Sequence, residues 1–172
     1  MPTGENLRAT AVENALVDAP AKEPLSLGSF LPYRFSVVAE CLSRLFAEHY
    51  ERRFGISIPE WRLMAVLGEH APQSTQEVIT RTEMDRVRVS RAAIRLEDKG
   101  LIARKTHPHD QRAHLLSLTR KGLAMYRQIV PLARQLQREL ETEFSTDEIQ
   151  ALDRILTKLQ ARLTELAPGE GA

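Results

Sequence analysis

The sequence has a single cysteine, Cys41, among its 172 residues. One thiol excludes a disulfide within the chain and a zinc site built from cysteines, and it fits a reducing cytoplasm. Aromatic residues are scarce, at 5% of the chain. No run of apolar residues approaches the ~20 that a membrane-spanning helix needs. We therefore expect a cytoplasmic, helix-rich protein without a membrane partner.

The chain also lacks the motifs of the common enzyme classes. It contains no glycine-rich phosphate loop, no Cys/His nucleophile arrangement and no cluster of metal ligands. His107 and His109 have the spacing of a metal-binding pair, but no third ligand is evident nearby, and we interpret them as polar residues of a turn. The sequence thus predicts a protein that is not an enzyme and that needs no cofactor or metal.

Helix signals are present over most of the chain. Capping boxes occur at Ser57–Glu60, Ser74–Glu77 and Ser145–Glu148, and Asp85 and Thr119 are candidate N-caps. Combined with apolar residues at helical spacing, they predict helices over residues 30–53, 59–69, 74–81, 85–99, 119–144 and 145–167. The alanine-rich residues 1–28, interrupted by prolines, are expected to form a flexible arm and not a secretory signal.

A short hairpin is expected after the fourth helix. Residues 101–106 and 113–119 are typical of strands, and residues 107–112 are expected to be the turn between them. A short helix, a tight turn, a basic helix and a hairpin follow one another in the order of a winged helix-turn-helix. The predicted fold class is mainly α with a small β-wing.

The net charge of +1 conceals an uneven distribution. Residues 85–122 contain ten Lys/Arg against four Asp/Glu, a local charge of +6, whereas residues 1–84 carry −3 and residues 123–172 carry −2. Positive charge concentrated on one helix and one hairpin indicates a surface that faces the phosphates of nucleic acid.

The basic helix separates its apolar and charged residues. On a helical wheel its apolar arc consists of Val89, Ala92, Ala93 and Leu96, and the opposite arc holds Arg88, Arg91 and Arg95. Arg91 and Arg95 repel one another at i,i+4 spacing, a cost that is explained if phosphates and guanine edges supply the counter-charge. The candidate DNA-binding residues here are Arg86, Arg88, Ser90, Arg91 and Arg95; the alternative is a merely soluble basic helix.

The hairpin adds candidates of its own. Arg112 near the tip of a two-stranded wing is expected to enter the adjacent minor groove, where the potential is most negative. Asp110 is placed to orient either Arg112 or an arginine of the helix, and His109 is a third wing-tip candidate for DNA binding.

These residues resemble those of the MarR family of bacterial transcription regulators. The resemblance covers roughly residues 30–165, and three motifs carry it: Ser90-Arg91 with Leu96-Glu-Asp-Lys-Gly-Leu-Ile-Ala-Arg104, Asp110-Gln-Arg112, and Leu118-Thr-Arg-Lys-Gly122. It implies a homodimer that binds a pseudo-palindromic DNA site, usually as a repressor, and that is often released by a small anionic aromatic molecule.

The apolar stripes of residues 30–53, 119–144 and 145–167 independently favour dimerisation, because they contribute little to one small DNA-binding lobe. Paired copies would place two recognition helices about 34 Å apart, one turn of DNA. We expect a dimerisation helix over 29–56, a winged helix-turn-helix over 57–119, dimerisation helices over 120–167 and a tail over 168–172. The alternatives are a monomeric bundle, and a dimeric interaction module without specific DNA binding.

The candidate effector-binding residues are Tyr33, Arg34, Val37, Trp61 and Arg62. An arginine that clamps a carboxylate beside a stacking aromatic ring is physically reasonable. The stretch from Leu31 to Gly68 is similar to family members that control aromatic acid catabolism, some of which answer hydroxycinnamates or their CoA thioesters. The alternative is that Trp61 belongs to the core and that both arginines form interhelical salt bridges.

Cys41 leaves a redox-responsive regulator as a further alternative. In the peroxide-sensing branch of the family the reactive cysteine lies near the start of the first helix, at the position that Tyr33 occupies here. Cys41 lies two turns further on within an apolar stripe, where we expect a small buried apolar residue.

Overall fold

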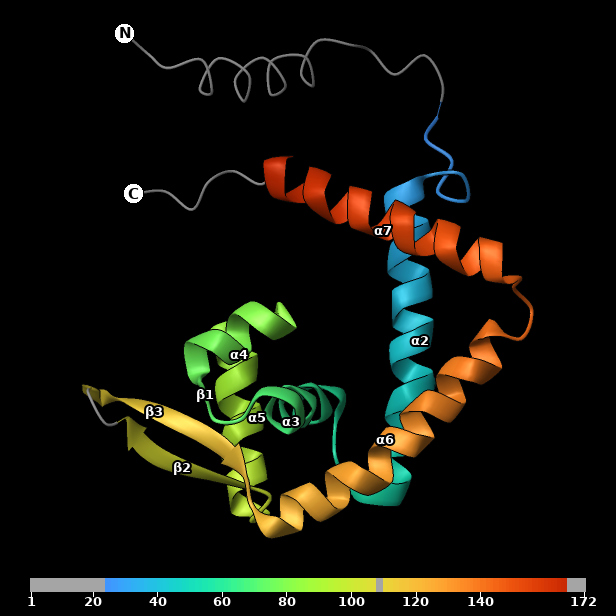
Figure 1. Cartoon of the computed structure of the whole chain (residues 1–172). Coiled ribbons are helices and arrows are strands. Elements are labelled where there is room, and N and C mark those ends of the chain that lie inside the picture. Colours follow the sequence, from blue (N-terminus) through green and yellow to red (C-terminus); the bar gives the residue numbers. More distant parts are fainter. Residues whose placement is uncertain (1–23, 108–109, 167–172) are drawn as a thin grey trace, which may run out of the picture. The chain divides into compact units, whose positions relative to one another are not determined.

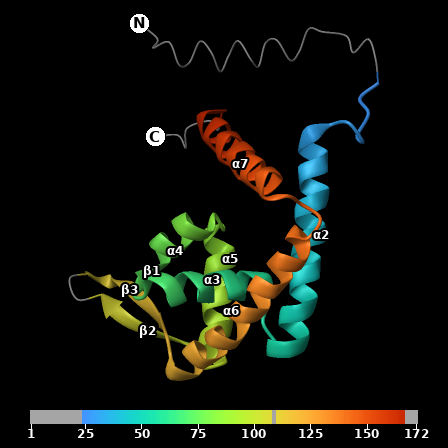
Figure 2. The same ribbon diagram turned by 45° about the vertical axis from the view of Figure 1, so that its right-hand side comes forward.

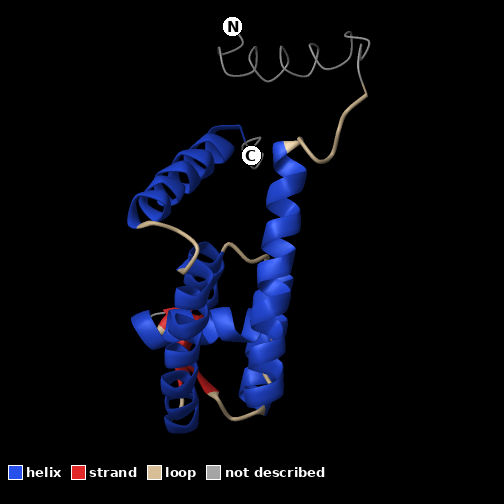
Figure 3. Ribbon diagram, turned by 90° about the vertical axis from the view of Figure 1, so that its right-hand side faces the viewer, coloured by secondary structure: helices blue, strands red, loops and turns tan. Residues whose placement is uncertain are grey.

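The computed structural model describes residues 24–107 and 110–166, apart from the side chains of residues 107–113. The described residues form six helices and three short strands (Figure 1). The elements are α2 (Leu31–Phe54), α3 (Ile58–His70), β1 (Gln73–Ser74), α4 (Thr75–Thr82), α5 (Arg86–Asp98), β2 (Ile102–His107), β3 (Asp110–Leu118), α6 (Arg120–Glu141) and α7 (Thr146–Leu166). The mainly helical fold with a small sheet is as predicted (Figure 3).

The predicted capping boxes start their helices as expected. The backbone N–H of Ser57 donates to Glu60, that of Ser74 to Glu77 and that of Ser145 to Glu148, at 2.6–2.8 Å. Asp85 caps α5 by accepting the N–H of Arg88 at 2.7 Å. Each side chain satisfies a backbone donor that the first helical turn leaves without a partner.

The chain divides into two units, and Phe35–Leu140 is the larger. Its core gathers apolar residues from α2, α3, α4, α5, the sheet and α6. The largest of them are Tyr50, Ile56, Leu63, Met64, Leu67, Val78, Val89, Leu96, Leu101, Leu116 and Ile129. Within this unit α5 packs against both α3 and α4, so the core fixes the orientation of the basic helix.

The sheet is antiparallel, in the order β1-β3-β2. The β2–β3 hairpin extends to one side of α3, α4 and α5 in both views (Figures 1 and 2). β1, which the sequence did not predict, pairs Gln73 with Leu116 and Ser74 with Leu115. It anchors the start of α4 to the hairpin.

The hairpin has longer strands than predicted. The prediction of a six-residue turn over 107–112 was wrong, because β2 continues to His107 and β3 already begins at Asp110. Thr106 pairs with His114 but His107 pairs with Asp110, so the register shifts and a bulge on β3 takes up the extra residues.

The buried carboxylate of Glu60 connects the start of α3 to the end of α5. Glu60 of α3 is only 2% exposed, and Nζ of Lys99, at the end of α5, lies 2.7 Å from its Oε1. Lys99 also donates to the carbonyl of Gly55 at 2.8 Å. Burial disfavours the charged form of Glu60, but the hydrogen bonds from Lys99 and Ser57 outweigh it and lower the pKa of this carboxyl.

The second unit comprises Met1–Arg34 and Glu141–Ala172, of which residues 24–34 and 141–166 are described. No side chain of α7 is buried. Its exposed large apolar residues recur at helical spacing: Leu152, Ile155, Leu156, Leu163 and Leu166. A helix with such a stripe is stable in water only when another surface covers the stripe.

The predicted arm and tail lie largely outside the described residues, at 1–23 and 167–172. Within the described chain, no helix combines the length and the apolar character needed to cross a bilayer.

Candidate DNA interface and ligand cavity

α4 and α5 form a helix-turn-helix whose turn is set by two residues. Glu83, after α4, adopts the left-handed conformation with φ of 53°, and Asp85 then caps α5. The apolar arc predicted for α5 is buried as expected, and all four of its residues belong to the core. The opposite face of α5 is therefore left to solvent.

The arginines of that face differ in their surroundings. Nε of Arg88 lies 3.2 Å from Oδ2 of Asp85, so this arginine is partly neutralised within the chain. A guanidinium nitrogen of Arg86 lies 3.5 Å from the side-chain oxygen of Gln76. Arg91 and Arg95 are exposed and form no ion pair or hydrogen bond with the described residues. These two arginines carry the uncompensated charge that phosphates or guanine would complement.

The remaining predicted DNA-binding residues are placed less completely. Ser90 is exposed on α5. The backbone of Asp110 and Arg112 lies in β3, whereas their side chains and the whole of His109 lie outside the described residues. The base of the wing is tied to α5 by Arg104, whose guanidinium nitrogen lies 3.5 Å from Oε2 of Glu97.

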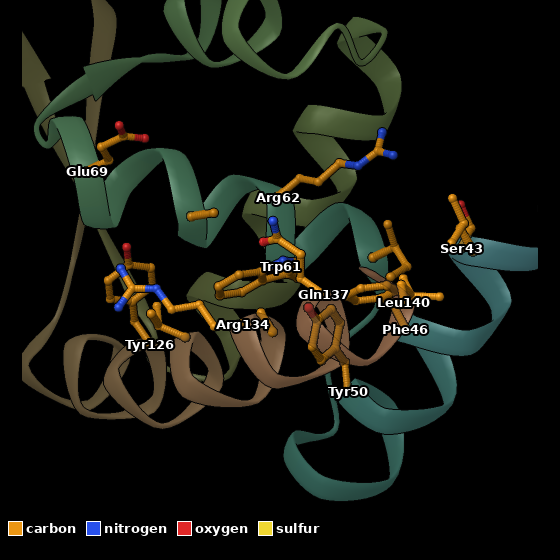
Figure 4. A pocket seen from close by; sticks show the side chains of 15 residues that line it. Ser43, Phe46, Tyr50, Trp61, Arg62, Glu69, Tyr126, Arg134, Gln137 and Leu140 are labelled. Atoms are coloured by element: carbon orange, nitrogen blue, oxygen red, sulfur yellow. The ribbon is translucent and has the colours of Figure 1, made fainter. Parts of the chain in front are cut away.

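The same unit contains a cavity of about 580 Å³ between α2, α3 and α6. Four aromatic side chains line it: Phe46, Tyr50, Trp61 and Tyr126 (Figure 4). The rings of Trp61 and Tyr126 are stacked with centroids 6.0 Å apart, and Trp61 lies 5.4 Å from Tyr50. The volume and the aromatic lining suit a small, partly aromatic molecule.

Charged side chains from two helices also line this cavity. Arg62 and Glu69 come from α3, and Arg134 comes from α6. The arginines have no ion pair with any described residue, while Glu69 lies 3.5 Å from Nε2 of His70. Two cations against one carboxylate give the cavity a positive balance, which favours an anionic ligand.

One polar atom of the wall is buried without a partner. The hydroxyl of Tyr50 makes no hydrogen bond to the described residues, and the residue is 1% exposed. Burial raises the pKa of Tyr50 to about 12. A neutral phenol is thus held beside the cavity with an unused donor.

The sequence-predicted effector residues fall into two groups. Trp61 and Arg62 line the cavity, and Trp61 also packs against the core. Tyr33, Arg34 and Val37 are exposed on α2 and are not among the residues that line the cavity. The salt bridge proposed as the alternative for Arg62 is not formed with any described residue.

Sequence reasoning missed the contribution of α6. Tyr126, Val130, Ala133 and Gln137 recur at helical spacing and line one side of the cavity, with Arg134 beside them. The spacing was visible in the sequence, but it had been interpreted only as a dimerisation stripe.

Cys41 was expected to be buried, and this prediction was wrong. Its side chain is exposed in the single chain, and a guanidinium nitrogen of Arg44 lies 3.9 Å from its Sγ. The stripe to which Cys41 belongs is itself solvent-facing here, because Val37, Val38 and Leu45 of α2 are also exposed.

The helix-turn-helix, the basic face of α5 and the hairpin define a DNA-binding transcriptional regulator of the winged-helix class. The family model described as "MarR family" matches residues 54–113. The chain is 26% identical over 110 residues to the homoprotocatechuate degradative operon repressor of Escherichia coli, covering 64% of this chain and 74% of that protein. Residues 54–113 thus match the MarR family, and these relatives are transcriptional regulators and not enzymes.

Solved structures agree with this assignment. A MarR/EmrR family regulator from Acinetobacter sp. ADP1 superposes with a TM-score of 0.76 at 26% identity, over 82% of this chain and 99% of that one. A mutant MarR of E. coli, solved with operator DNA, gives a TM-score of 0.69 at 26% identity, over 75% and 92% of the two chains. The predicted winged helix-turn-helix is thereby confirmed.

Proposed function

We propose that this regulator is a homodimeric, cytoplasmic repressor that leaves a pseudo-palindromic operator when a small anionic aromatic molecule, or its CoA thioester, binds the cavity. The observation that carries the effector part is the cavity itself, with four aromatic side chains and two arginines that lack partners among the described residues. An aromatic ring stacks on such walls, and a guanidinium binds a carboxylate in a bidentate manner.

The name of one relative supports the ligand class. The homoprotocatechuate degradative operon repressor of E. coli is named for an operon that degrades an aromatic acid. Carried over to this chain as a proposal, it favours an aromatic carboxylate over a neutral or cationic ligand.

The apolar stripe of α7 supports the homodimer. Its exposed leucines and isoleucines require a cover, and a second copy of the chain supplies a self-complementary one. A two-fold dimer places its two α5 helices on two half-sites, which is the reason for a pseudo-palindromic operator.

Release of DNA requires that the effector binds one arrangement of the dimer more tightly than the other. A ligand with a 100-fold preference for the arrangement that does not fit DNA shifts the equilibrium by about 2.7 kcal/mol per site. Because α6 lines the cavity and directly follows the wing, a ligand between α3 and α6 is well placed to have such a preference.

Titration calorimetry with benzoates, hydroxycinnamates and their CoA thioesters tests the proposal. The variants are Arg62→Gln, Arg134→Gln and Arg34→Gln, with Arg138→Gln as the control, because Arg138 is exposed on α6 and does not line the cavity. We expect Arg134→Gln or Arg62→Gln to weaken binding about 10-fold or more, the loss of a charged hydrogen bond, and Arg138→Gln to leave it unchanged.

The same titration separates the alternatives. If only Arg34→Gln weakens ligand binding, the carboxylate of the ligand binds at the exposed part of α2. If no compound of the panel binds at micromolar concentration, the anionic aromatic effector is wrong, while DNA binding is unaffected. If peroxide alone releases DNA and Cys41→Ser abolishes that release, the redox-responsive alternative replaces this proposal.

A further inference from the structure

The solvent-facing side of α5 is not uniformly charged. Val87 is 57% exposed and Ile94 is 50% exposed, although both are large β-branched aliphatic residues. Seven residues separate them, so at 3.6 residues per turn they lie within about 20° of one another around the helix axis. Arg91 lies between them on the same face, about 40° from Val87 and 60° from Ile94.

This aliphatic pair marks the middle of the exposed face. The buried residues of α5 are Val89, Ala92, Ala93 and Leu96, and their mean direction lies opposite Val87 and Ile94. Arg88 and Arg95 lie to one side of this line and Ser90 to the other. Whatever binds α5 along its outermost line therefore meets two apolar groups first, with arginines around them.

A binding partner for this face must offer apolar groups and negative charge together. The major groove of DNA does so, because the C5-methyl group of thymine projects into it between two rows of phosphates. Arg91 and Arg95, which have no partner among the described residues, supply the attraction to phosphate or guanine, and the aliphatic side chains match methyl groups.

We propose that Val87 and Ile94 are specificity-determining residues that contact thymine methyl groups, on either side of a guanine held by Arg91. Val87 and Ile94 are about 10 Å apart along the axis, from 1.5 Å of rise per residue. Base pairs are 3.4 Å apart, so for a helix lying along the groove the two thymines are about three base-pair steps apart. The half-site is thus predicted to be rich in A·T pairs around one G·C pair. The inference rests on DNA binding by this chain and not on the dimer or the effector.

The test removes single methyl groups from the DNA. Duplexes that the full-length protein selects from a random pool provide the operator. Each thymine is then replaced by deoxyuridine, which differs only in lacking the C5-methyl group, and binding is measured by fluorescence anisotropy at one salt concentration. We expect two positions per half-site to lose about 3- to 5-fold in affinity, the value of one buried methyl group.

The protein variants assign those positions to residues. Val87→Ala should remove the sensitivity to deoxyuridine at one position, and Ile94→Ala at the other, while each leaves its partner position sensitive. Thr80→Ala is the control, because it shortens an exposed β-branched side chain on α4, outside α5 and outside the expected dimerisation helices. It should leave both positions sensitive.

Each failure has a different meaning. If deoxyuridine is tolerated at every position, methyl contacts do not determine specificity and the proposal is wrong. If the sensitive positions persist in both alanine variants, other residues contact the methyl groups, and the assignment to Val87 and Ile94 is wrong. If the pool yields no preferred sequence at all, specific DNA binding is wrong, and the specificity role of Val87 and Ile94 is wrong with it. If both variants bind all duplexes as the wild type does, Val87 and Ile94 do not contribute to DNA recognition and the proposal is wrong.

Discussion

Lys99 and Glu60 form an ion pair in which Nζ lies 2.7 Å from Oε1, and this pair joins the start of α3 to the end of the basic helix α5. The carboxylate is almost fully buried, whereas the side chain of Lys99 is 39% exposed. Removing the charge of Glu60 leaves a lysine that water can still solvate, so the loss is smaller than for a fully buried pair.

Glu60→Gln should destabilise the fold by about 1.5–3 kcal/mol at pH 7, with the exposure of Lys99 favouring the lower end. The pKa of Glu60 is lowered in the folded state, so its contribution is fully present above the unfolded value of about 4.3 and is lost as the pH falls through the folded pKa. Urea unfolding from pH 7 to pH 3 should show the two proteins converging at the acidic end. A difference in the free energy of unfolding between the two proteins that stays constant with pH would contradict the role of the charge of Glu60.

Arg91→Ala should weaken binding to the selected operator by about 1–3 kcal/mol and relax discrimination at one base pair, as expected for an arginine that contacts guanine. Arg112→Ala should weaken binding to all sequences more evenly if that residue contacts phosphates or the minor groove. Gel-shift or anisotropy titrations check both, with Arg138→Ala as the control for the loss of one positive charge. Unchanged affinity for the operator in both variants would show that α5 and the wing do not contact DNA.

Leu156→Glu should convert the proposed homodimer to a monomer, because the substitution places a charge in the apolar stripe of α7. Ala161→Glu is the matched control: it adds the same charge to the opposite side of α7, where the residue is also exposed. Sedimentation velocity distinguishes the two. Deletion of residues 146–172 should likewise abolish the dimer; a deleted protein that still sediments as a dimer would place the interface elsewhere.

Tyr50→Phe should raise the free energy of unfolding, by about 1 kcal/mol or more, because it removes a buried hydroxyl that has no hydrogen-bond partner among the described residues. The ring and its contacts with Phe46 and Trp61 are retained. The free energies of unfolding of the variant and of the wild type are measured by urea unfolding without ligand. The same measurement on the wild type with an effector bound in the cavity is the comparison. A variant less stable than the wild type would show that the hydroxyl has a partner in solution.

Gly122→Ala should be among the most damaging single substitutions in the chain. A Cβ at Gly122 would overlap the carbonyl oxygen of Leu101, which accepts a hydrogen bond from the N–H of Thr119 at 3.0 Å. Backbone cannot move aside as the end of a side chain can, so we expect a loss of several kcal/mol. Thermal unfolding checks the loss, and Ala124→Gly, at an exposed position of the same helix, should cost about 1 kcal/mol.

Local features of this chain were predictable because their causes are local. The bond from Ser74 to Glu77, and the cap of Asp85 on Arg88, span three residues each, so spacing alone revealed them. β1 escaped prediction because two residues, Gln73 and Ser74, carry no periodicity; their strand exists only because β3 lies beside them.

Functional residues were predictable only where one helix determines the site. The arginine face of α5 follows from its own periodicity and from the burial of Val89 and Leu96. The cavity needs three helices, and which residue of α6 meets Trp61 depends on tertiary packing that no pattern of residues encodes. For that reason the sequence did not indicate Arg134 as a residue of the cavity.

The first turns of α6 bring together two parts of the molecule that have so far been treated separately. Gly122 lies against Leu101, the residue that links the basic helix α5 to the wing, and Tyr126, four residues later, forms part of the cavity wall. Four residues correspond to about 6 Å along a helix. In the effector response proposed above, a molecule that displaces the ring of Tyr126 would press on the junction between α5 and the wing through one helical turn. Such a response would need no long relay of side chains between the cavity and DNA.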